Sequence, residues 1–514
     1  MTDVSTPSDP MRAKQLKRRH DAERRFKLYG QMAIGLAVSF LAMLLLSIGS
    51  KAIGAFSRHS LTLPLEAIER PVDGPPTVTQ INLAVRTALV ETLPQASEDR
   101  LERAEIYSLT TRLAVLPLQR QLAANPALAD RPITVKLALS DDLDLYLKNE
   151  AAAHRINELG QAGRFIETET GRFRLTDAGL DGFVDLRERI GRAEGQDLDI
   201  LVSFNGAWFD LVEITGAALV LSHLAGPVPD LGEQTAQSIQ AIALETPGMD
   251  RKVSNRQIAI ALYLKDQGLI TRAFNTELFV NADSTYPELA GAAAALFGSI
   301  FTMLITALFA LPIGILAAVY LEEFAEKSVL TSIIEVNINN LAAVPSIIFG
   351  LLGAAVFLNT FDLPRSVPLV GGLVLGLLVL PTIIIASRAA LRAVPPSVRD
   401  AALGLGASPS QAVFHHVLPL AAPGILTGAI IAMARALGET APLLLIGMVA
   451  FISEVPTSPN DEATVLPVLI YKWFSGAERA WEPMTAAVII LLLTVLVAMN
   501  LVATLLRRRF EQRW

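Results

Sequence analysis

Cysteine is absent from this 514-residue chain, and charged residues make up only 18% of it. Without cysteine there is no disulfide framework and no thiolate metal site. The phosphate-binding pattern G-x-x-x-x-G-K-[ST] is also missing, so the chain carries no P-loop for ATP. His154 and His223 lie far apart without a zinc-type spacing, and we interpret both as packing or surface residues. No nucleophile–base spacing occurs either, so we expect no catalytic residues, no cofactor and no metal ion.

Hydrophobic residues are abundant, at 52% of the chain, and the mean hydropathy is +0.44. This composition is typical of integral membrane proteins. The net charge of −7 is unevenly distributed, because Ala52–Asp283 holds 22 Lys and Arg against 32 Asp and Glu. The remainder holds 21 against 18 and is mildly basic. An acidic polar block within an apolar chain predicts a soluble domain on the side opposite the basic loops.

Six apolar stretches are long enough to cross a bilayer. They are Tyr29–Gly49, Leu289–Leu321, Val336–Phe361, Ser366–Ser387, Ala421–Ile452 and Pro483–Leu506. Six spans place both termini on one side, and the basic N-terminus and Arg507–Arg509 indicate that this side is the cytoplasm. The chain is therefore predicted to be a mainly α-helical polytopic membrane protein. The acidic domain then falls outside, and the loop that holds Arg388, Arg392 and Arg399 falls inside.

The first 28 residues are rich in Lys and Arg, which suits either a membrane anchor or a nucleic-acid contact. An apolar span follows at once, so we favour the anchor and expect no nucleic-acid partner. The long polar block reads as α+β. Thr79–Leu128 has helical periodicity, and an acid-rich helix starts at Asp141. The predicted strands are Ile133–Ser140, two within Phe165–Thr176, Asp197–Phe204 and Ala259–Leu264, while apolar Gly216–Leu224 is predicted to be core.

The stretch Arg399–Pro419 lies between two spans and is predicted to form two short helices. Ser397 is placed to cap the first helix through Leu405, and Gly406 suits its left-handed end. Ser408 is placed to cap the second helix, with Pro409 at its first position and Gln411 completing a capping box. Two helices between membrane spans predict a docking device.

This stretch resembles the EAA loop of ABC importer permeases. That pattern is Glu-Ala-Ala, three residues, Gly, nine residues, a hydrophobic residue, one residue, then Leu-Pro. The matching residues here are Asp400, Ala401, Ala402, Gly406, Leu418 and Pro419. The chain departs from the pattern at Asp400, a shorter acid, and at His416, where the family has Ile. The resemblance implies that Asp400–Leu418 sits in a groove of a partner ATPase.

Arg435 and Glu439 are charged residues within a predicted span. Arg435 lies 14 residues past Ala421, which is about 21 Å along a helix and near mid-membrane. An arginine there costs about 2.5–3.5 kcal/mol to insert, so it must face a partner, a cavity or water. The two residues share one helix face at i, i+4, and Pro442 is predicted to bend the helix just beyond them. They form either a structural ion pair or part of a translocation path, and we favour the path because a packing pair is easily replaced by apolar residues.

Four segments narrow the resemblance to phosphate ABC permeases of the PstA type. They read LPIGILAAVYLEEFA (311–325), NNLAAVPSIIFGLLG (339–353), LPTIIIASRAALRAVPPSVRDAALGLGAS (380–408) and ALGETAPLL (436–444). The likeness covers roughly residues 285–514 and implies a type I ABC importer permease fold there. The 52–283 insert resembles the extra N-terminal domain of a long PstA subgroup. The implied organisation is a cytoplasmic basic tail (1–28), a first transmembrane helix (29–50), an extracytoplasmic α+β domain (51–284) and a permease domain with five transmembrane helices (285–514), whose cytoplasmic coupling loop spans 393–420.

The resemblance also implies partners. In that family a PstC-type permease, a PstB-type ATPase dimer and an extracytoplasmic phosphate-binding protein complete an importer of the bacterial inner membrane, and Arg435 and Glu439 belong to the anion path. Permeases for molybdate or sulfate, and the PstC-type half, fit the loop as well, although the RALGETAP and SIIFG segments favour phosphate. A membrane-anchored sensor is a further alternative, but it predicts a cytoplasmic output domain that the sequence lacks. The role of the 52–283 insert stays open.

Overall fold

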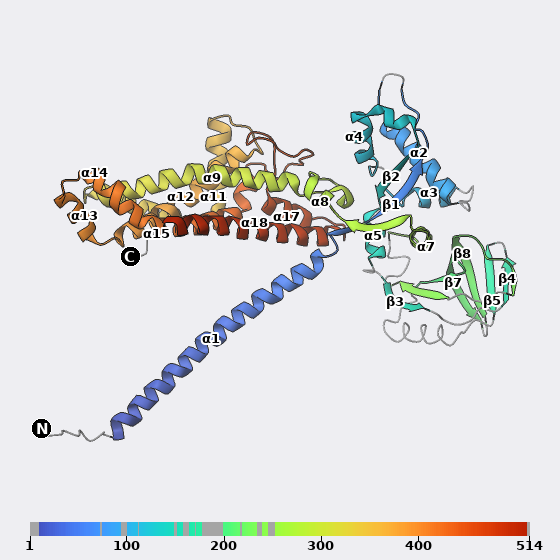
Figure 1. Ribbon diagram of the computed structural model, residues 1–514, viewed down its shortest axis with the longest axis horizontal. Helices are drawn as coiled ribbons and strands as arrows, with labels where there is room; N and C mark the ends of the chain where they lie inside the picture. Colours follow the sequence, from blue (N-terminus) through green and yellow to red (C-terminus); the bar gives the residue numbers. More distant parts are fainter. Residues whose placement is uncertain are drawn as a thin grey trace.

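The computed structural model shows a long helical bundle with two sheets at one end of it (Figure 1). The described residues are 10–71, 74–93, 100–111, 113–148, 152–157, 164–169, 171–176, 199–215, 218–233, 239–244 and 252–510. Helix α1 (Pro10–Ala52) meets the bundle only at its C-terminal end and diverges from it toward the N-terminus. The basic tail from Pro10 onward is therefore helical and continuous with the first span.

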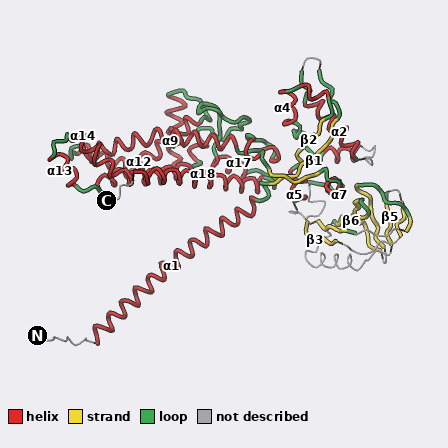
Figure 2. Tube along the Cα trace, in the orientation of Figure 1, coloured by secondary structure: helices red, strands yellow, loops and turns green. Residues whose placement is uncertain are grey.

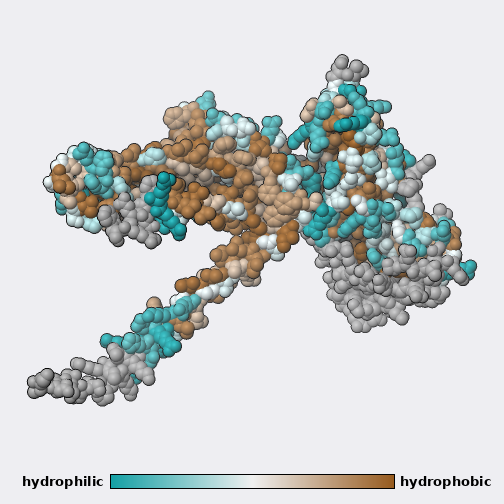
Figure 3. Space-filling view, viewed as in Figure 1, coloured by the Kyte–Doolittle hydropathy of each residue, from teal (hydrophilic) through white to brown (hydrophobic). Residues whose placement is uncertain are grey.

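Within the described residues, five helices are long and apolar enough to cross a membrane, and a bent helix pair forms a sixth crossing if it counts as one span. The long helices are α1, α9 (Ala293–Val319), α12 (Pro368–Arg392), α15 (Leu418–Leu437) and α18 (Trp481–Phe510). Hydrophobic residues cover the middle of the bundle and the part of α1 nearest to it, whereas both ends of the molecule are more hydrophilic (Figure 3). This distribution is that of a polytopic membrane protein.

The predicted third span, Val336–Phe361, is not one straight helix. Helix α10 (Val329–Ala342) and helix α11 (Ser346–Gly353) are bent by 103° at the break between them. Helix α11 then continues as the π-helix η5 (Ala354–Thr360). Pro345 explains the break, because it lacks an N–H and keeps the preceding residue out of the helical region.

The predicted fifth span, Ala421–Ile452, is also wrong as a single helix. Helix α15 ends at Leu437, and the chain restarts after Glu439 as the short helix α16 (Ala441–Leu445). Pro442 cannot donate to the carbonyl of Gly438, and glycine is itself a poor helix former. The predicted bend is therefore a complete interruption. Helix α17 (Leu466–Phe474), which follows a long connection, was not predicted.

Helix α12 lies at the centre of the bundle and packs closely against α9 and α15. A Cβ atom at Gly376 would lie 2.5 Å from the Phe309 ring, and one at Gly428 would lie 2.3 Å from the Cβ of Ala386. Both contacts are too short for any side chain, so glycine sets the distance between these helices. Small residues at helix contacts are the usual means of close packing in membranes.

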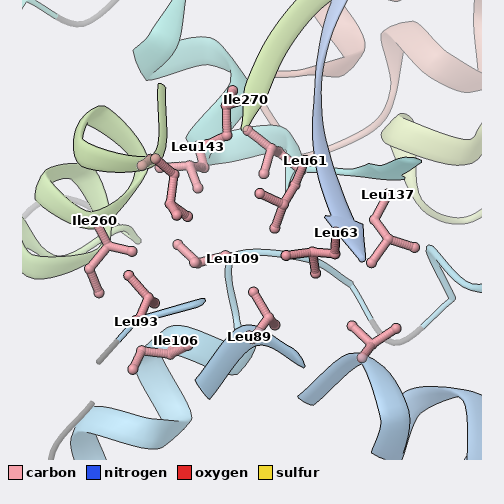
Figure 4. Packing of buried hydrophobic residues seen from close by; sticks show 14 of the residues in the cluster. Leu61, Leu63, Leu89, Leu93, Ile106, Leu109, Leu137, Leu143, Ile260 and Ile270 are labelled. Atoms are coloured by element: carbon pink, nitrogen blue, oxygen red, sulfur yellow. The ribbon is translucent and has the colours of Figure 1, made fainter. Parts of the chain in front are cut away.

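A three-stranded antiparallel sheet with the order β11-β1-β2 connects the bundle to the rest of the N-terminal half. Its strands are β1 (Ser57–Leu65), β2 (Ile133–Ala138) and β11 (Ile270–Phe274). The helices around it are α2 (Val78–Thr92), α3 (Arg100–Tyr107), α4 (Leu116–Ala124), η1 (Pro126–Asp130), α5 (Asp141–Leu147) and α7 (Asn255–Asp266). Leucines and isoleucines from the strands and helices meet in one core between them (Figure 4).

A second sheet has eight strands in the order β3-β10-β6-β7-β8-β5-β4-β9 (Figure 2). They are β3 (Ala152–Asn157), β4 (Arg164–Glu169), β5 (Arg172–Thr176), β6 (Ile200–Phe204), β7 (Ala207–Thr215), β8 (Ala218–Ala225), β9 (Gly232–Glu233) and β10 (Gln240–Leu244). Buried phenylalanines, including Phe165, Phe204 and Phe209, form its separate core.

The α+β composition of this half is confirmed, but one predicted strand is wrong. Ala259–Leu264 lies inside helix α7, which begins with a capping box between Ser254 and Gln257. A short apolar run fits a buried helix as well as a strand, and the cap decides between them here. The Nε2 atom of His223 donates a hydrogen bond to the Gly226 carbonyl, at 2.8 Å. The side chain of His154 lies outside the described residues.

Ionic contacts join the small sheet to the helical bundle. The guanidinium of Arg58 on β1 pairs with Glu277 on α8 (Glu277–Val280). Asp283 accepts from Lys472 and from the indole of Trp473, the latter at 3.2 Å. The Arg58 contact connects β1 to α8, and the Asp283 contacts connect the segment before α9 to α17.

Glu288, in the 3₁₀ turn η3 (Pro287–Leu289) before α9, is buried at this junction. Its side chain is 8% exposed, and neither carboxylate oxygen has a hydrogen-bond partner among the described residues. Burial raises its pKa to about 7, and the negative charges of Asp141 and Glu478 act in the same direction. The guanidinium of Arg58 donates to the backbone carbonyl of Glu288 at 2.6 Å.

The melting temperature of the protein is expected to fall, relative to that of Glu288→Gln, as the pH rises from 4.5 to about 7. The folded state holds this proton more tightly than the unfolded state, so its contribution is full below the ordinary pKa of 4.5 and is lost as the pH passes about 7. The largest resulting change in the free energy of unfolding is about 3 kcal/mol. Thermal unfolding of both proteins in the same detergent measures this change. Equal changes of melting temperature with pH in the two proteins would contradict the prediction.

Candidate coupling loop and translocation site

The predicted docking stretch forms two helical segments at the end of the bundle farthest from the sheets (Figure 1). They are α13 (Pro396–Gly404) and α14 (Pro409–Ala412). Gly406 between them has φ +88, and Ser408 and Gln411 form the predicted capping box. Ser397 does not cap α13, because the helix already begins at Pro396 with Pro395 in the capping position. Proline at the first helical position needs no side-chain cap for its missing N–H.

Helix α14 does not end as a separate short helix. It continues through the π-helix η6 (Val413–Val417) directly into α15, so Leu418 and Pro419 form the first turn of that span. The predicted docking stretch is therefore one separate helix, α13, followed by an extension of the membrane helix α15. His416, which departs from the EAA pattern, lies exposed within η6.

The six residues of the EAA pattern do not share one face. Asp400, Ala401, Gly406 and Pro419 are exposed and Leu418 is half-buried, but Ala402 is only 6% exposed. Ala402 therefore packs within the chain. An apolar side chain that the pattern does not include, Leu405, is 91% exposed at the tip of the loop.

Arg435 lies level with the middle of α12. Helices α15 and α12 run antiparallel, with Gly424 against Ala390 and Gly428 against Ala386. Arg435 lies seven residues after Gly428. Because the helices are antiparallel, it is level with the position seven residues before Ala386, which is close to the midpoint of Pro368–Arg392. Although α15 ends two residues later, at Leu437, Arg435 is central to the bundle as the sequence predicted.

The side chain of Arg435 is 52% exposed and that of Glu439 is 19% exposed. The Arg435 Nε atom lies 3.6 Å from Glu439 Oε1, an ion pair that is too long for a hydrogen bond. Ile431, one turn earlier, is 63% exposed, so this face of α15 is uncovered in the single chain. An arginine held loosely on an open face keeps donors available for an anion or for a second subunit.

The two interrupted spans meet beside this site. Gly350 on α11 lies against Pro442 on α16, so closely that a Cβ atom on the glycine would be 2.7 Å from the Pro442 Cα. Irregular backbone at membrane depth is tolerated where it is buried in protein or lines a water-filled cavity. Broken helices of this kind also form the substrate sites of many secondary transporters.

Comparison with known proteins identifies two regions. Residues 310–513 match the family described as binding-protein-dependent transport system inner membrane component, and residues 13–156 match a domain of unknown function, DUF3333. The phosphate transport system permease protein PstA 1 of Mycobacterium tuberculosis is 31% identical over 213 residues, which are 41% of this chain and 69% of that protein. PstA of Haemophilus influenzae is 31% identical over 237 residues, which are 45% of this chain and 82% of that protein.

This chain belongs to the PstA family of phosphate transport system permeases. The predicted family is thus confirmed. A solved structure of the MetNI methionine ABC transporter aligns with 42% of this chain and 95% of that chain, at 17% identity and a TM-score of 0.36.

As a PstA-family member, the chain is an ABC transporter permease subunit and a multi-pass protein of the bacterial inner membrane. Permease subunits of this kind take part in transport and are not catalytic. The 310–513 match contains the α13–α14 loop, Arg435 and Glu439, whereas the 13–156 match contains α1 and the first two strands of the small sheet.

Proposed function

We propose that the chain is the PstA-type permease of an ATP-driven phosphate importer and forms the anion path together with a second permease. The observation that carries this proposal is Arg435, a half-exposed arginine at the mid-depth of the bundle. A phosphate dianion needs positive charge along its route through a low-dielectric bilayer. Glu439, held at 3.6 Å, weakens the site enough for the anion to leave again.

The orientation follows from the two ends of the bundle. The α13–α14 loop and the C-terminus lie at one end, and the sheets lie at the other (Figure 1). Arg507–Arg509 and the arginines of the loop favour the cytoplasm for the first end. We therefore assign residues 51–284 to the extracytoplasmic side, both termini to the cytoplasm, and six crossings to the chain, with α10 and α11 counted as one.

The exposed residues of the α13–α14 loop and the open face of α15 indicate which partners the chain binds. Exposed Asp400, Ala401 and Leu405 suit docking into a groove of a PstB-type ATPase dimer, which supplies the ATP hydrolysis. The open face of α15 at Ile431 and Arg435 suits a PstC-type permease as the other half of the path. An extracytoplasmic phosphate-binding protein delivers the anion at the end that carries the sheets.

Uptake and competition test the substrate. We expect cells that express this chain with its second permease, ATPase and binding protein to accumulate radiolabelled phosphate, and cells without the chain to lose that uptake. Excess unlabelled phosphate should compete, whereas sulfate and molybdate should not, because at neutral pH phosphate carries a proton that a binding site can recognise and the other two do not. Competition by molybdate or sulfate as strong as that by phosphate would favour the alternative oxyanion permease. Normal uptake without the chain would favour a sensor.

A further inference from the structure

Arg399, directly before the exposed Asp400, uses its whole guanidinium within the chain. Its Nε donates to Glu323 Oε2 at 2.8 Å, and one terminal nitrogen donates to the other oxygen of the same carboxylate. The two terminal nitrogens also donate to the backbone carbonyls of Val394 and Leu391, at 3.1 and 3.2 Å. The side chain thus joins α13 to the last turn of α12 and to Glu323 at once.

Glu323 belongs to the π-helix η4 (Tyr320–Phe324), which ends α9. The neighbouring Glu322 binds a different pair of arginines: Arg392 donates to it at 2.8 Å and Arg388 at 3.3 Å. The adjacent carboxylates of Glu322 and Glu323 therefore pair with arginines of two different elements, α12 and α13. The wide turn of a π-helix changes the directions of successive side chains, which allows this division.

The Arg399–Glu323 pair is comparably enclosed to the Arg388–Glu322 pair, whose side chains are 12% and 16% exposed. The Glu323 side chain is 6% exposed and that of Arg399 is 25% exposed, whereas Arg392 is 59% exposed. Hydrogen bonding to Glu323 raises the pKa of the Arg399 guanidinium, so it stays charged at any physiological pH. A bidentate arginine–carboxylate contact fixes orientation as well as distance. The pair therefore holds α13 at a set angle to α9.

Helix α9 connects this contact to the path. It packs along α12, with Phe309 over Gly376, and its cytoplasmic part shares a buried apolar cluster with Val417 and Ile425 at the base of α15. A rotation of α13 that Arg399 and Glu323 transmit therefore reaches α9 and, through this cluster, α15, the helix that carries Arg435. A loose α13 would turn without moving them.

We propose that Arg399 and Glu323 form the joint through which movement of the coupling helix α13 reaches α9 and the bundle. They are positioning residues for transport and touch neither ATP nor phosphate. This inference rests on the proposed docking of the α13–α14 loop on an ATPase.

The test compares Arg399→Gln, Glu323→Gln and the charge exchange Arg399→Glu with Glu323→Arg in the complete reconstituted complex. Each single variant should retain the ATPase during purification and hydrolyse ATP at close to the normal rate. Phosphate transport per ATP hydrolysed should fall about tenfold, a typical size for the coupling between two sites. The exchange, which restores an ion pair of reversed direction, should recover most of the lost transport per ATP.

Two further variants make the result decisive. Arg399→Lys keeps the charge but loses the planar fork, and should give an intermediate ratio of transport to ATP hydrolysis. Arg392→Gln removes the exposed partner of Glu322 without touching α13, and should leave that ratio unchanged. Normal ratios in both single Gln variants, or no recovery in the exchange, would overturn the joint. Failure of the unmodified chain to retain any ATPase would instead overturn the docking on which it rests.

Discussion

Replacing Arg435 and Glu439 together by glutamine is expected to remove most phosphate uptake while the complex still assembles. The double change leaves no unpaired charge at mid-depth, so folding and insertion should be little affected. Hydrogen bonds to a charged group contribute about 1.5–3 kcal/mol, so the loss of an arginine that meets the anion should lower uptake roughly tenfold to a hundredfold. Uptake normalised to the amount of assembled complex is the measurement.

Two controls separate the path from packing. Arg435→Lys keeps the charge without the fork and should retain partial uptake. Val497→Ala changes an exposed apolar side chain on another membrane helix, α18, and should retain uptake close to normal. If the double Gln variant transports as well as the unmodified chain, Arg435 and Glu439 are a structural pair and the path lies elsewhere.

Leu405→Glu is expected to release the ATPase from the membrane complex. The side chain is 91% exposed within the chain, so the substitution disturbs no packing of the permease itself. At an interface, a charge in place of an apolar anchor is desolvated without a partner, and such anchors contribute 2 kcal/mol or more. We expect at least a roughly thirtyfold weaker association with the ATPase. Co-purification of the ATPase at increasing salt and dilution measures this.

A buried neighbour supplies the contrast for Leu405. Ala402→Glu introduces the same charge on the same helix at a position that is 6% exposed, and should lower the yield of folded permease. Leu405→Glu should leave that yield unchanged. Retention of the ATPase by Leu405→Glu at the normal level would show that the tip of the loop lies outside the contact.

Local features of the coupling loop could be predicted because their causes are local. Gly406 at a left-handed position and the Ser408–Gln411 capping box are each specified by residues within a few positions. Ser397 was assigned wrongly for an equally local reason, because the two prolines before it already start the helix. Ala402 is buried although Ala401 and Leu403 beside it are exposed, so its burial depends on the elements that pack against α13, of which η6 is one.

Interruptions of the membrane helices could be predicted only in part. Hydropathy measures whether a segment tolerates lipid, and it is the same on both sides of a break, so Ala421–Ile452 read as one span. Pro442 indicated a distortion but not that α15 ends at Leu437. Contacts between residues far apart in the sequence could not be predicted. Arg399 and Glu323 are 76 residues apart, and neither is unusual in its local sequence. Only the folded bundle shows that they meet.

The π-helix η6 sets the rotational phase between the coupling loop and the path. If Pro409–Leu437 were α-helical throughout, the side chains of α14 would point in different directions around the helix axis, relative to Arg435, from those that they have now. A π turn holds one additional residue, which rotates everything before it by about 100° against everything after it. Gain or loss of this turn re-aims α14 around the helix axis while the helix stays unbroken. The angle around the helix axis between α14 and the part of α15 that carries Arg435 is therefore set at Val413–Val417.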